Sequence, residues 1–221
     1  MAEPRPTLDF SKTKINIRRT GDKIFASIDE RGYLNLNSVH NVIIKDNFFY
    51  SPKYILCILN SSLIDYIYRN LVPDDGRVFS EVKIINLKKL PIHKATPEEQ
   101  NPLIQNVDRI LKLNNNLQKE TNSFKDWFIH TFNIEKLSQK LEKYYELSID
   151  SFLNEVKKKK VNVKSRENYQ TLKEEFEKSV RVINPLLQQI METDSEIDQM
   201  VYDLYGLTPE EIKIIEESLD G

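Results

Sequence analysis

The stretch "KINIRRTGDKIFASID", residues 14–29, decides how the first part of the chain folds. Two runs in it, 14–19 and 23–29, alternate apolar with polar residues, which is the pattern of a strand with one buried face. Thr20, Gly21 and Asp22 lie between the runs, and such residues favour a tight turn. The stretch therefore predicts a β-hairpin that turns around Gly21.

The residues that follow the hairpin predict more strand and one helix. "YLNLNSVHNVIIK", residues 33–45, alternates apolar and polar side chains and ends in a Val-Ile-Ile run. "SPKYILCILNSSLIDYIYRNL", residues 51–71, has apolar positions at helical spacing. Ser51 suits the N-cap of this helix and Pro52 suits its first position.

The stretch "VKIINLKKLPI", residues 82–92, predicts a strand followed by a turn. Residues 1–96 are therefore expected to form an α+β domain, with a small mixed β-sheet and one prominent helix.

Residues 97–221 predict helix almost throughout, and hence an all-helical bundle or helical hairpin that acts as a spacer or docking region. Thr96 and Glu99 have the spacing of a capping box. The longest predicted helix, 166–204, contains Pro185, which should bend or divide it. Further helices are expected at 124–132, at 134–147, after Ser148, and after a C-cap at Gly206 with Thr208 and Pro209 opening the last one.

Charge is divided unevenly along the 221 residues. The whole chain has 32 Lys and Arg against 34 Asp and Glu. Residues 1–97 hold 15 basic and 10 acidic side chains, and residues 98–221 hold 17 and 24. The first part is therefore the one that can approach a phosphate backbone.

The composition also limits the cellular setting. With Cys57 as the single cysteine, no internal disulfide or cysteine-based zinc site is possible. No apolar run reaches the roughly 18–20 residues of a membrane span, and the start has no apolar signal segment. We expect a cytoplasmic protein that does not enter the membrane.

One stretch has the letters of a metal-dependent nuclease. Pro73-Asp74 is followed by Glu81-x-Lys83, a pattern in which two carboxylates and a lysine hold a metal and stabilise a phosphorane. Glu81 and Lys83 would share a face of a strand, whereas Asp74 lies in a turn after a helix. The nuclease is therefore the weakest of the functional hypotheses.

Other catalytic patterns are missing from the sequence. His40, His93 and His130 lie in different predicted elements without metal-ligand spacing. The glycines form no phosphate-binding loop. We therefore predict no catalytic, metal or cofactor-binding residue in this chain, and whether the chain has any enzymatic activity stays open.

Binding chemistry is better supported. Basic and polar side chains cluster at the hairpin turn and again after Gly76. An arginine there can form two hydrogen bonds to guanine, a glutamate can accept one from cytosine, and lysines can pair with phosphates. The candidate DNA-binding residues are Arg18, Arg19, Thr20, Lys23, Arg77, Ser80, Glu81 and Lys83.

The order of these blocks resembles the TaqI-like C-terminal specificity domain of adenine-specific DNA methyltransferases and type IIG restriction-modification enzymes. The resemblance lies in "KINIRRTGDKIFASIDERGYLNLNSVHNVII", then "YILCILNSSLIDYIYR" and "GRVFSEVKIINLKKLPI". The ending "DSEIDQMVYDLYGLTPEEIKIIE" is similar to the helical ending of the same enzymes.

The resemblance implies a target recognition domain that reads double-stranded DNA, while another domain methylates adenine and, in some enzymes, a further domain cleaves. S-adenosylmethionine and Mg²⁺ are then expected only in the parent enzyme. The chain is expected to be an excised C-terminal piece or a separate specificity subunit that pairs with a methyltransferase domain. A helical protein-interaction scaffold is the alternative of a different class.

Overall fold

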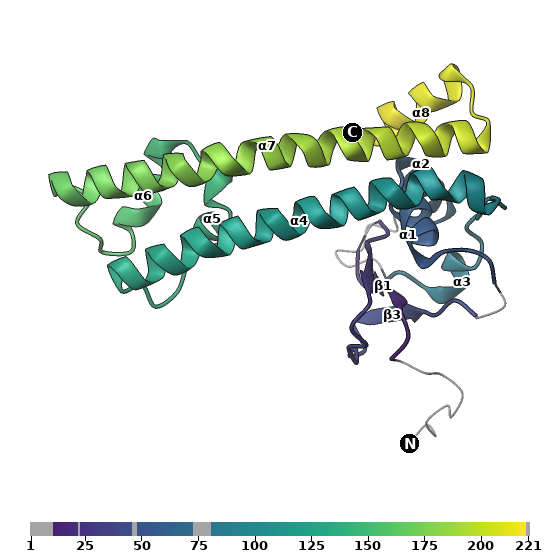
Figure 1. Ribbon diagram of the computed structural model, residues 1–221, viewed down its shortest axis with the longest axis horizontal. Coiled ribbons are helices and arrows are strands. Elements are labelled where there is room, and N and C mark those ends of the chain that lie inside the picture. Colours follow the sequence, from purple (N-terminus) through teal and green to yellow (C-terminus); the bar gives the residue numbers. More distant parts are fainter. Residues whose placement is uncertain (1–10, 22, 46–47, 73–80, 220–221) are drawn as a thin grey trace. The chain divides into compact units, whose positions relative to one another are not determined.

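The computed structural model describes residues 11–21, 23–45, 48–72 and 81–219 (Figure 1). The chain separates into two compact units. The sheet unit comprises residues 1–108 and 194–221, and the hairpin unit comprises residues 109–193. The domain division predicted at 96/97 stays a prediction. The α+β fold class is confirmed, because a three-stranded sheet with helices precedes a largely helical region.

The sheet has the order β2-β1-β3, and both of its strand pairs are antiparallel. The predicted hairpin is confirmed, with Ile15 of β1 opposite Ile28 of β2. On the other side of β1, Ile15 lies opposite Val42 of β3. Ile15 and Ile17 are buried. Alternation then places Asn16 and the exposed Arg18 on the opposite face. The strands are β1 Lys14–Arg18, β2 Ala26–Asp29 and β3 Val39–Val42.

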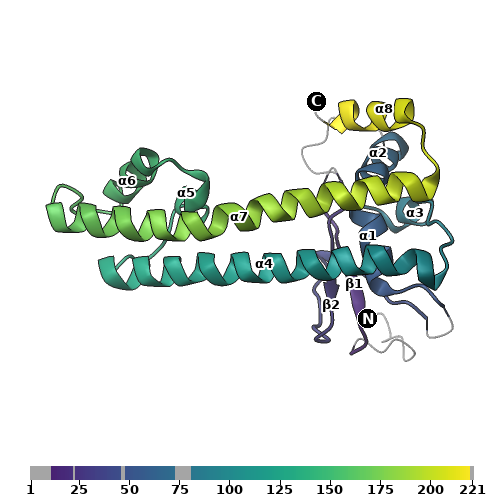
Figure 2. The same ribbon diagram turned by 45° about the horizontal axis from the view of Figure 1, so that its top comes forward.

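The single helix predicted over 51–71 is two helices, α1 Pro52–Asn60 and α2 Ser62–Leu71 (Figure 2). Ser61 divides them because its backbone is extended, with ψ of 151°, and its Oγ caps α2 by accepting from the N–H of Ile64. The side chain of Asn60, at the end of α1, bonds the backbone N–H and C=O of Ala26 at 3.0 Å each. The predicted N-cap at Ser51 is confirmed.

The strand predicted from residue 82 onward is wrong. The Val82 N–H donates to the Arg19 carbonyl at 2.8 Å, and Thr20 and Glu81 form an isolated bridge. The chain then enters a short helix, α3 Ile84–Leu87. The Lys83 carbonyl accepts from the N–H groups of Asn86 and Leu87 at 3.0 and 3.1 Å, so local helical hydrogen bonds take the place of the expected strand ladder.

In the helical second part the predicted capping box forms, whereas several predicted helix boundaries differ from the observed ones. The Thr96 hydroxyl accepts from the Glu99 N–H, and Glu99 accepts from the Thr96 N–H, which confirms the capping box. One helix, α4 Pro97–Phe132, contains the segment predicted as a separate helix at 124–132. The helix α7 Arg166–Tyr205 continues through Pro185 and is not divided there. Residues 134–147 form short pieces in place of one helix. The remaining elements are α5 Gln139–Glu142, η1 Tyr144–Glu146, α6 Ile149–Lys157 and α8 Pro209–Leu219.

The hairpin unit has an aromatic core. The rings of Phe124 and Tyr144 stack with centroids 4.0 Å apart, and those of Phe152 and Phe176 stack at 4.7 Å. The Tyr144 hydroxyl donates to Ser179 Oγ at 2.6 Å, because Ser179 in turn donates to Glu120 at 3.1 Å. Aromatic packing and this buried hydrogen-bond chain together connect α4, η1 and α7.

Hydrogen bonds connect the two parts of the sheet unit that lie far apart in the sequence. Asp198 on α7 accepts from the backbone N–H of Ser62 at 2.8 Å and from its hydroxyl at 2.6 Å. Tyr205 donates to the Pro91 carbonyl at 2.7 Å and accepts from the His93 N–H at 3.0 Å. These bonds explain why residues 194–221 belong to the same compact unit as the sheet. In the described residues, no helix has both the length and the apolar character required to cross a membrane.

Candidate nucleic-acid interface

Arg19 lies at the centre of the polar contacts beyond the end of β1. Its Nε donates to Glu81 Oε1 at 2.8 Å, and one of its terminal nitrogens donates to the Asn37 carbonyl at 3.2 Å. The hydrogen bond from Arg19 holds the pKa of the Glu81 carboxyl below its usual value. Both side chains remain nearly half exposed, at 43% and 45%. The pair is thus fixed in place but accessible to an approaching ligand.

The backbone explains why these two residues meet. The Arg19 N–H donates to the Ser38 carbonyl at 2.9 Å, which prolongs the β1–β3 pairing by one residue. The Arg19 carbonyl accepts from Val82 on its other side. Arg19 is therefore held between the residue that precedes β3 and the residue that follows Glu81.

A hollow of about 600 Å³ opens beside this pair. Its polar lining combines guanidinium, ammonium, imidazole, carboxylate and amide groups. The His40 Nε2 donates to the Val82 carbonyl at 2.7 Å, since a carbonyl can only accept, and this fixes the proton on Nε2. The lining residues are Arg19, Asn35, Leu36, Asn37, Val39, His40, Asn41, Glu81, Lys83 and Ile84.

Asn35 and Asn41 line this hollow, and Asn16 is hydrogen-bonded to Asn35. The Asn35 Nδ2 donates to Asn16 Oδ1 and to Asn41 Oδ1, both at 2.7 Å. Asn16 and Asn41 are directly opposite each other on β1 and β3. Carboxamides are the side chains that pair with adenine through two hydrogen bonds. The cluster therefore offers a surface that can read a base edge.

A second cationic group lies at the hairpin end. The Arg18 guanidinium and the Lys23 ammonium lie 5.8 and 5.0 Å from the centre of the Phe25 ring. The Phe25 side chain is 44% exposed, and its carbonyl accepts from the Arg18 N–H at 2.9 Å. Cations placed over an aromatic ring are attracted to its face, so the ring holds two positive charges near one point.

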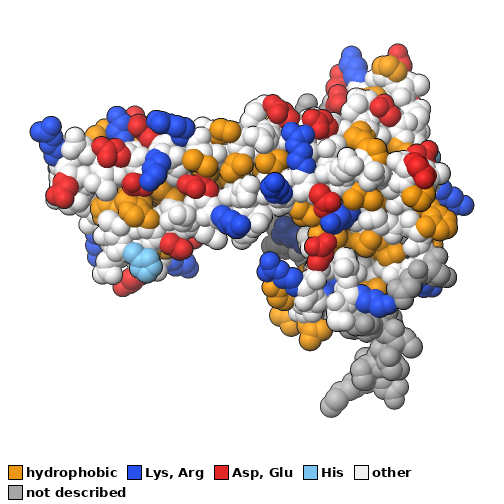
Figure 3. All heavy atoms as spheres, viewed as in Figure 1, with side chains coloured by type: hydrophobic (Ala, Val, Ile, Leu, Met, Phe, Trp, Pro, Cys, Tyr) orange, Lys and Arg blue, Asp and Glu red, His pale blue; other side chains and the backbone are white. Residues whose placement is uncertain are grey.

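Large apolar side chains are exposed next to the polar hollow. Leu34 and Leu36 are 83% and 85% exposed, and Tyr33 is 59% exposed. Figure 3 shows hydrophobic side chains grouped at the lower edge of the sheet unit, beside Lys and Arg side chains. Apolar side chains in a DNA interface contact thymine methyl groups or wedge between base steps.

The predicted site residues divide into three sets. Arg19, Glu81 and Lys83 line the hollow together. Arg18 and Lys23 meet at Phe25. Thr20 pairs with Glu81 through the backbone only. Arg77 and Ser80 lie outside the described residues. The assignment of all eight to DNA binding stays a prediction.

The nuclease hypothesis gains nothing from the described residues. Glu81 is bonded to Arg19, and Asp74 lies outside the described residues. Across the described ranges, no group of three His, Cys, Asp or Glu side chains could hold a metal. Cys57 is buried, and burial raises the pKa of its thiol to about 12, which does not favour a nucleophile.

Sequence reasoning missed the asparagines and His40 as site residues. The alternation in "NLNSVHN", residues 35–41, predicts a half-buried strand and no site residue. The signal for a site in this stretch is that asparagine recurs between apolar residues. A strand that only faces solvent could have any polar residue at those positions. Only the pairing of β1 with β3 brings Asn16 to them.

Comparisons with known families agree with the resemblance. Residues 2–92 match the model of the TaqI-like C-terminal specificity domain, and residues 96–201 match a domain of unknown function, DUF8810. No curated protein matches the chain. No solved structure matches it either. The chain thus carries a TaqI-like specificity domain, which indicates DNA target recognition in a restriction-modification context, joined to a region whose role is unknown.

Proposed function

We propose that this chain is the sequence-specific, double-stranded DNA recognition module of a restriction-modification enzyme. The hollow beside Arg19 and Glu81 reads base edges, and a separate domain of the parent enzyme methylates adenine, cleaves the DNA, or does both. The observation that carries this proposal is the meeting of amide, guanidinium and carboxylate groups in one open hollow of the specificity domain.

The chemistry of the hollow supports base reading over simple phosphate attraction. A phosphate site needs cations, whereas here Arg19 is paired with a carboxylate, and Lys83 shares the lining with several neutral amides and an imidazole. Donors and acceptors of mixed kind are what the edges of bases in the major groove require. Lys83, Arg18 and Lys23 supply the cations that hold the backbone.

S-adenosylmethionine and Mg²⁺ belong to the parent enzyme in this proposal. The site residues described here would act on DNA alone. Arg77 and Ser80 lie outside the described residues, shortly before Glu81 in the sequence, and remain candidates for base or backbone contact.

The test selects duplexes from a randomised pool with the whole chain and then compares variants on the selected sequence. Asn37→Ala is suited to this, because the side chain is exposed while Arg19 uses only the Asn37 backbone carbonyl. The matched control is Asn116→Ala, an exposed asparagine on α4. We expect Asn37→Ala to weaken binding to the selected duplex by about 5- to 100-fold, as for a lost base contact, and to change a random duplex little.

Two results would contradict the proposal. The selection would enrich no sequence, or Asn37→Ala and Asn116→Ala would behave alike on selected and random duplexes. Co-expression with a methyltransferase domain, followed by methylation mapping, then shows whether the enriched sequence is the one that is modified.

A further inference from the structure

The acidic second part of the chain contains one strongly basic segment. Residues 136–166 hold nine Lys and Arg and four Asp and Glu, a net charge of +5. The remainder of residues 98–221 holds eight and twenty, a net charge of −12. Positive charge is therefore concentrated in a stretch of 31 residues, which we call the basic tip.

The basic tip is one contiguous segment of the hairpin unit. It comprises α5, η1, α6 and the connection from α6 to the start of α7, which lie together in Figures 1 and 2. Lys140 of α5 and Lys158 after α6 converge on Glu155, with Nζ–Oε1 distances of 3.9 and 2.6 Å. These contacts join the basic residues of α5 to those at the end of α6.

Acidic side chains do not neutralise this surface. Glu155 carries a single charge, and its pKa is lowered by the hydrogen bond from Lys158 and by the charges of Lys158, Lys140 and Lys159. Lys143 is paired with Glu146 at 3.1 Å. Six further cations form no ion pair with an acidic side chain of the described chain: Lys136, Lys157, Lys159, Lys160, Lys164 and Arg166.

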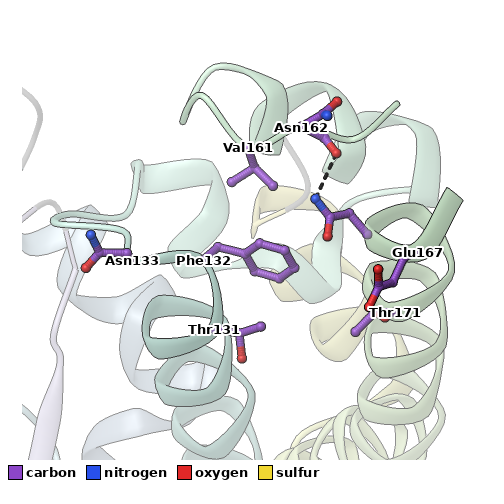
Figure 4. A pocket seen from close by; sticks show the side chains of 8 residues that line it. Thr131, Phe132, Asn133, Val161, Asn162, Glu167 and Thr171 are labelled. Atoms are coloured by element: carbon purple, nitrogen blue, oxygen red, sulfur yellow. Dashed lines mark hydrogen bonds between the residues drawn. The ribbon is translucent and has the colours of Figure 1, made fainter. Parts of the chain in front are cut away.

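The backbone that carries these lysines is well fixed. Asn162 Oδ1 accepts from the Lys164 N–H at 3.2 Å, and the Asn162 carbonyl accepts from Asn168 Nδ2 at 3.0 Å (Figure 4). Lys160 has a positive φ of 63°, which ends the helical run after α6. The lysines are thus displayed from an ordered connection, where their long stems remain free to reach a ligand.

A neighbouring hollow of about 490 Å³ is a poorer candidate for an anion. Figure 4 shows the Phe132 ring directed into it between Val161 and the start of α7, and Glu167 on its wall. A carboxylate and an aromatic ring do not favour a phosphate. A polyanion would instead lie over the lysines outside this hollow.

We propose that the basic tip binds the phosphate backbone of duplex DNA and adds a sequence-independent contact to the base reading of the sheet unit. This inference rests on the proposed function in taking DNA as the partner. Eight of the nine cations are lysines, which act as point charges toward phosphates and lack the rigid fork of arginine. Their separation from the base-reading hollow along the chain makes the two contributions separable by mutation.

The experiment compares two triple variants of the whole chain. The tip variant carries Lys157→Gln, Lys160→Gln and Lys164→Gln, all exposed positions. The control carries Lys112→Gln, Lys119→Gln and Lys178→Gln, exposed positions on α4 and α7 with the same loss of charge. Fluorescence anisotropy follows binding to a duplex of random sequence between about 50 and 200 mM salt. Circular dichroism checks that both variants keep the helical content of the native chain.

We expect the plot of log K against log salt to be less steep for the tip variant than for the native chain. The magnitude of the slope should fall by up to about 2.7, or about 0.9 for each lost phosphate contact. Between the two salt concentrations, the native chain would then lose up to about 40-fold more affinity than the tip variant. The control should keep the native slope. Equal slopes for the two variants would overturn the basic tip as a DNA surface.

The Asn37→Ala variant, measured beside them, separates this inference from the proposed function. Loss of sequence preference in Asn37→Ala with an unchanged tip slope overturns the basic tip alone. A lowered tip slope with no sequence preference in the native chain overturns the base reading alone. Absence of any binding by the native chain overturns both.

Discussion

Arg19 and Glu81 bond to each other at 2.8 Å although 62 residues separate them in the sequence. The backbone hydrogen bond from Val82 to Arg19 ties the same two segments together. The ion pair therefore sets which polar groups the hollow presents to a ligand. A ligand that binds Arg19 must compete with Glu81 for it.

The first prediction concerns this competition. Glu81→Gln removes the negative charge that holds Arg19, so the guanidinium becomes available to phosphates. We expect the affinity for a random duplex to rise by about 3- to 10-fold at low salt, as measured by anisotropy. The control is Glu30→Gln, another exposed acid of the sheet unit. An equal rise in both variants would show that bulk charge, and not Arg19, is responsible.

The second prediction concerns the exposed leucine in the wall of the hollow. Leu36→Ala should change the free energy of unfolding by less than about 0.5 kcal/mol, because the side chain is 85% exposed. It should weaken binding to the selected duplex by about 10-fold, because Leu36→Ala removes three apolar carbon atoms that partial burial against DNA would stabilise. Met191→Ala, 65% exposed on α7, serves as the control. Unchanged affinity in Leu36→Ala would remove this residue from the interface.

The third prediction concerns Asp198, which accepts two hydrogen bonds from Ser62. Asp198→Ala leaves both donors without this partner and should lower the free energy of unfolding by about 1–3 kcal/mol in urea. Asp198→Asn keeps an acceptor for the Ser62 N–H and a donor for its hydroxyl oxygen. We therefore expect the Asn variant to stay within about 1 kcal/mol of the native chain at neutral pH.

The same residue has a dependence on pH whose sign follows from its burial. Burial raises the pKa of Asp198 above its ordinary value of 3.8, and the Ser62 hydrogen bonds only partly oppose this. The folded state then binds the proton more tightly than the unfolded state. The contribution of Asp198 to the free energy of unfolding should therefore fall as pH rises from about 3.8 through the raised pKa.

Asp194, whose pKa is also raised by burial and by the charge of Asp198, acts in the same direction. In Asp198→Asn this loss of stability should be smaller. The free energy of unfolding of the variant, relative to that of the native chain, should therefore rise as pH increases across that window. A constant difference between the two proteins from acid to neutral pH would show that Asp198 is solvated in the folded chain.

The fourth prediction concerns the buried hydroxyl of Tyr144. Tyr144→Phe removes its bond to Ser179 while keeping the ring stacked on Phe124. We expect the free energy of unfolding to fall by about 1–2 kcal/mol in a urea titration. Tyr145→Phe, at the neighbouring half-buried position, should change it by less than about 0.5 kcal/mol. Equal effects would mean that the Tyr144–Ser179–Glu120 chain does not stabilise the hairpin unit.

Parts of the fold were predictable because they depend on neighbours in the sequence. The hairpin of residues 14–29, the capping box at Thr96 and Glu99, and the C-cap at Gly206 all follow from residue types a few positions apart. The breaks were harder to predict. Pro185 was expected to bend or divide its helix, yet α7 continues through it, and Ser61 divides a helix that looked continuous.

The amino-acid sequence by itself determined the α+β fold class, the helical second part and the positive charge of the first part. Alternation, helical spacing and capping are local properties, and composition needs no structure at all. Only the tertiary structure decided that Arg19 meets Glu81, that Asn35 joins Asn16 to Asn41, and that Ser62 bonds Asp198. Which side chains converge depends on the long-range packing of strands and helices, and no short stretch of residues specifies that packing.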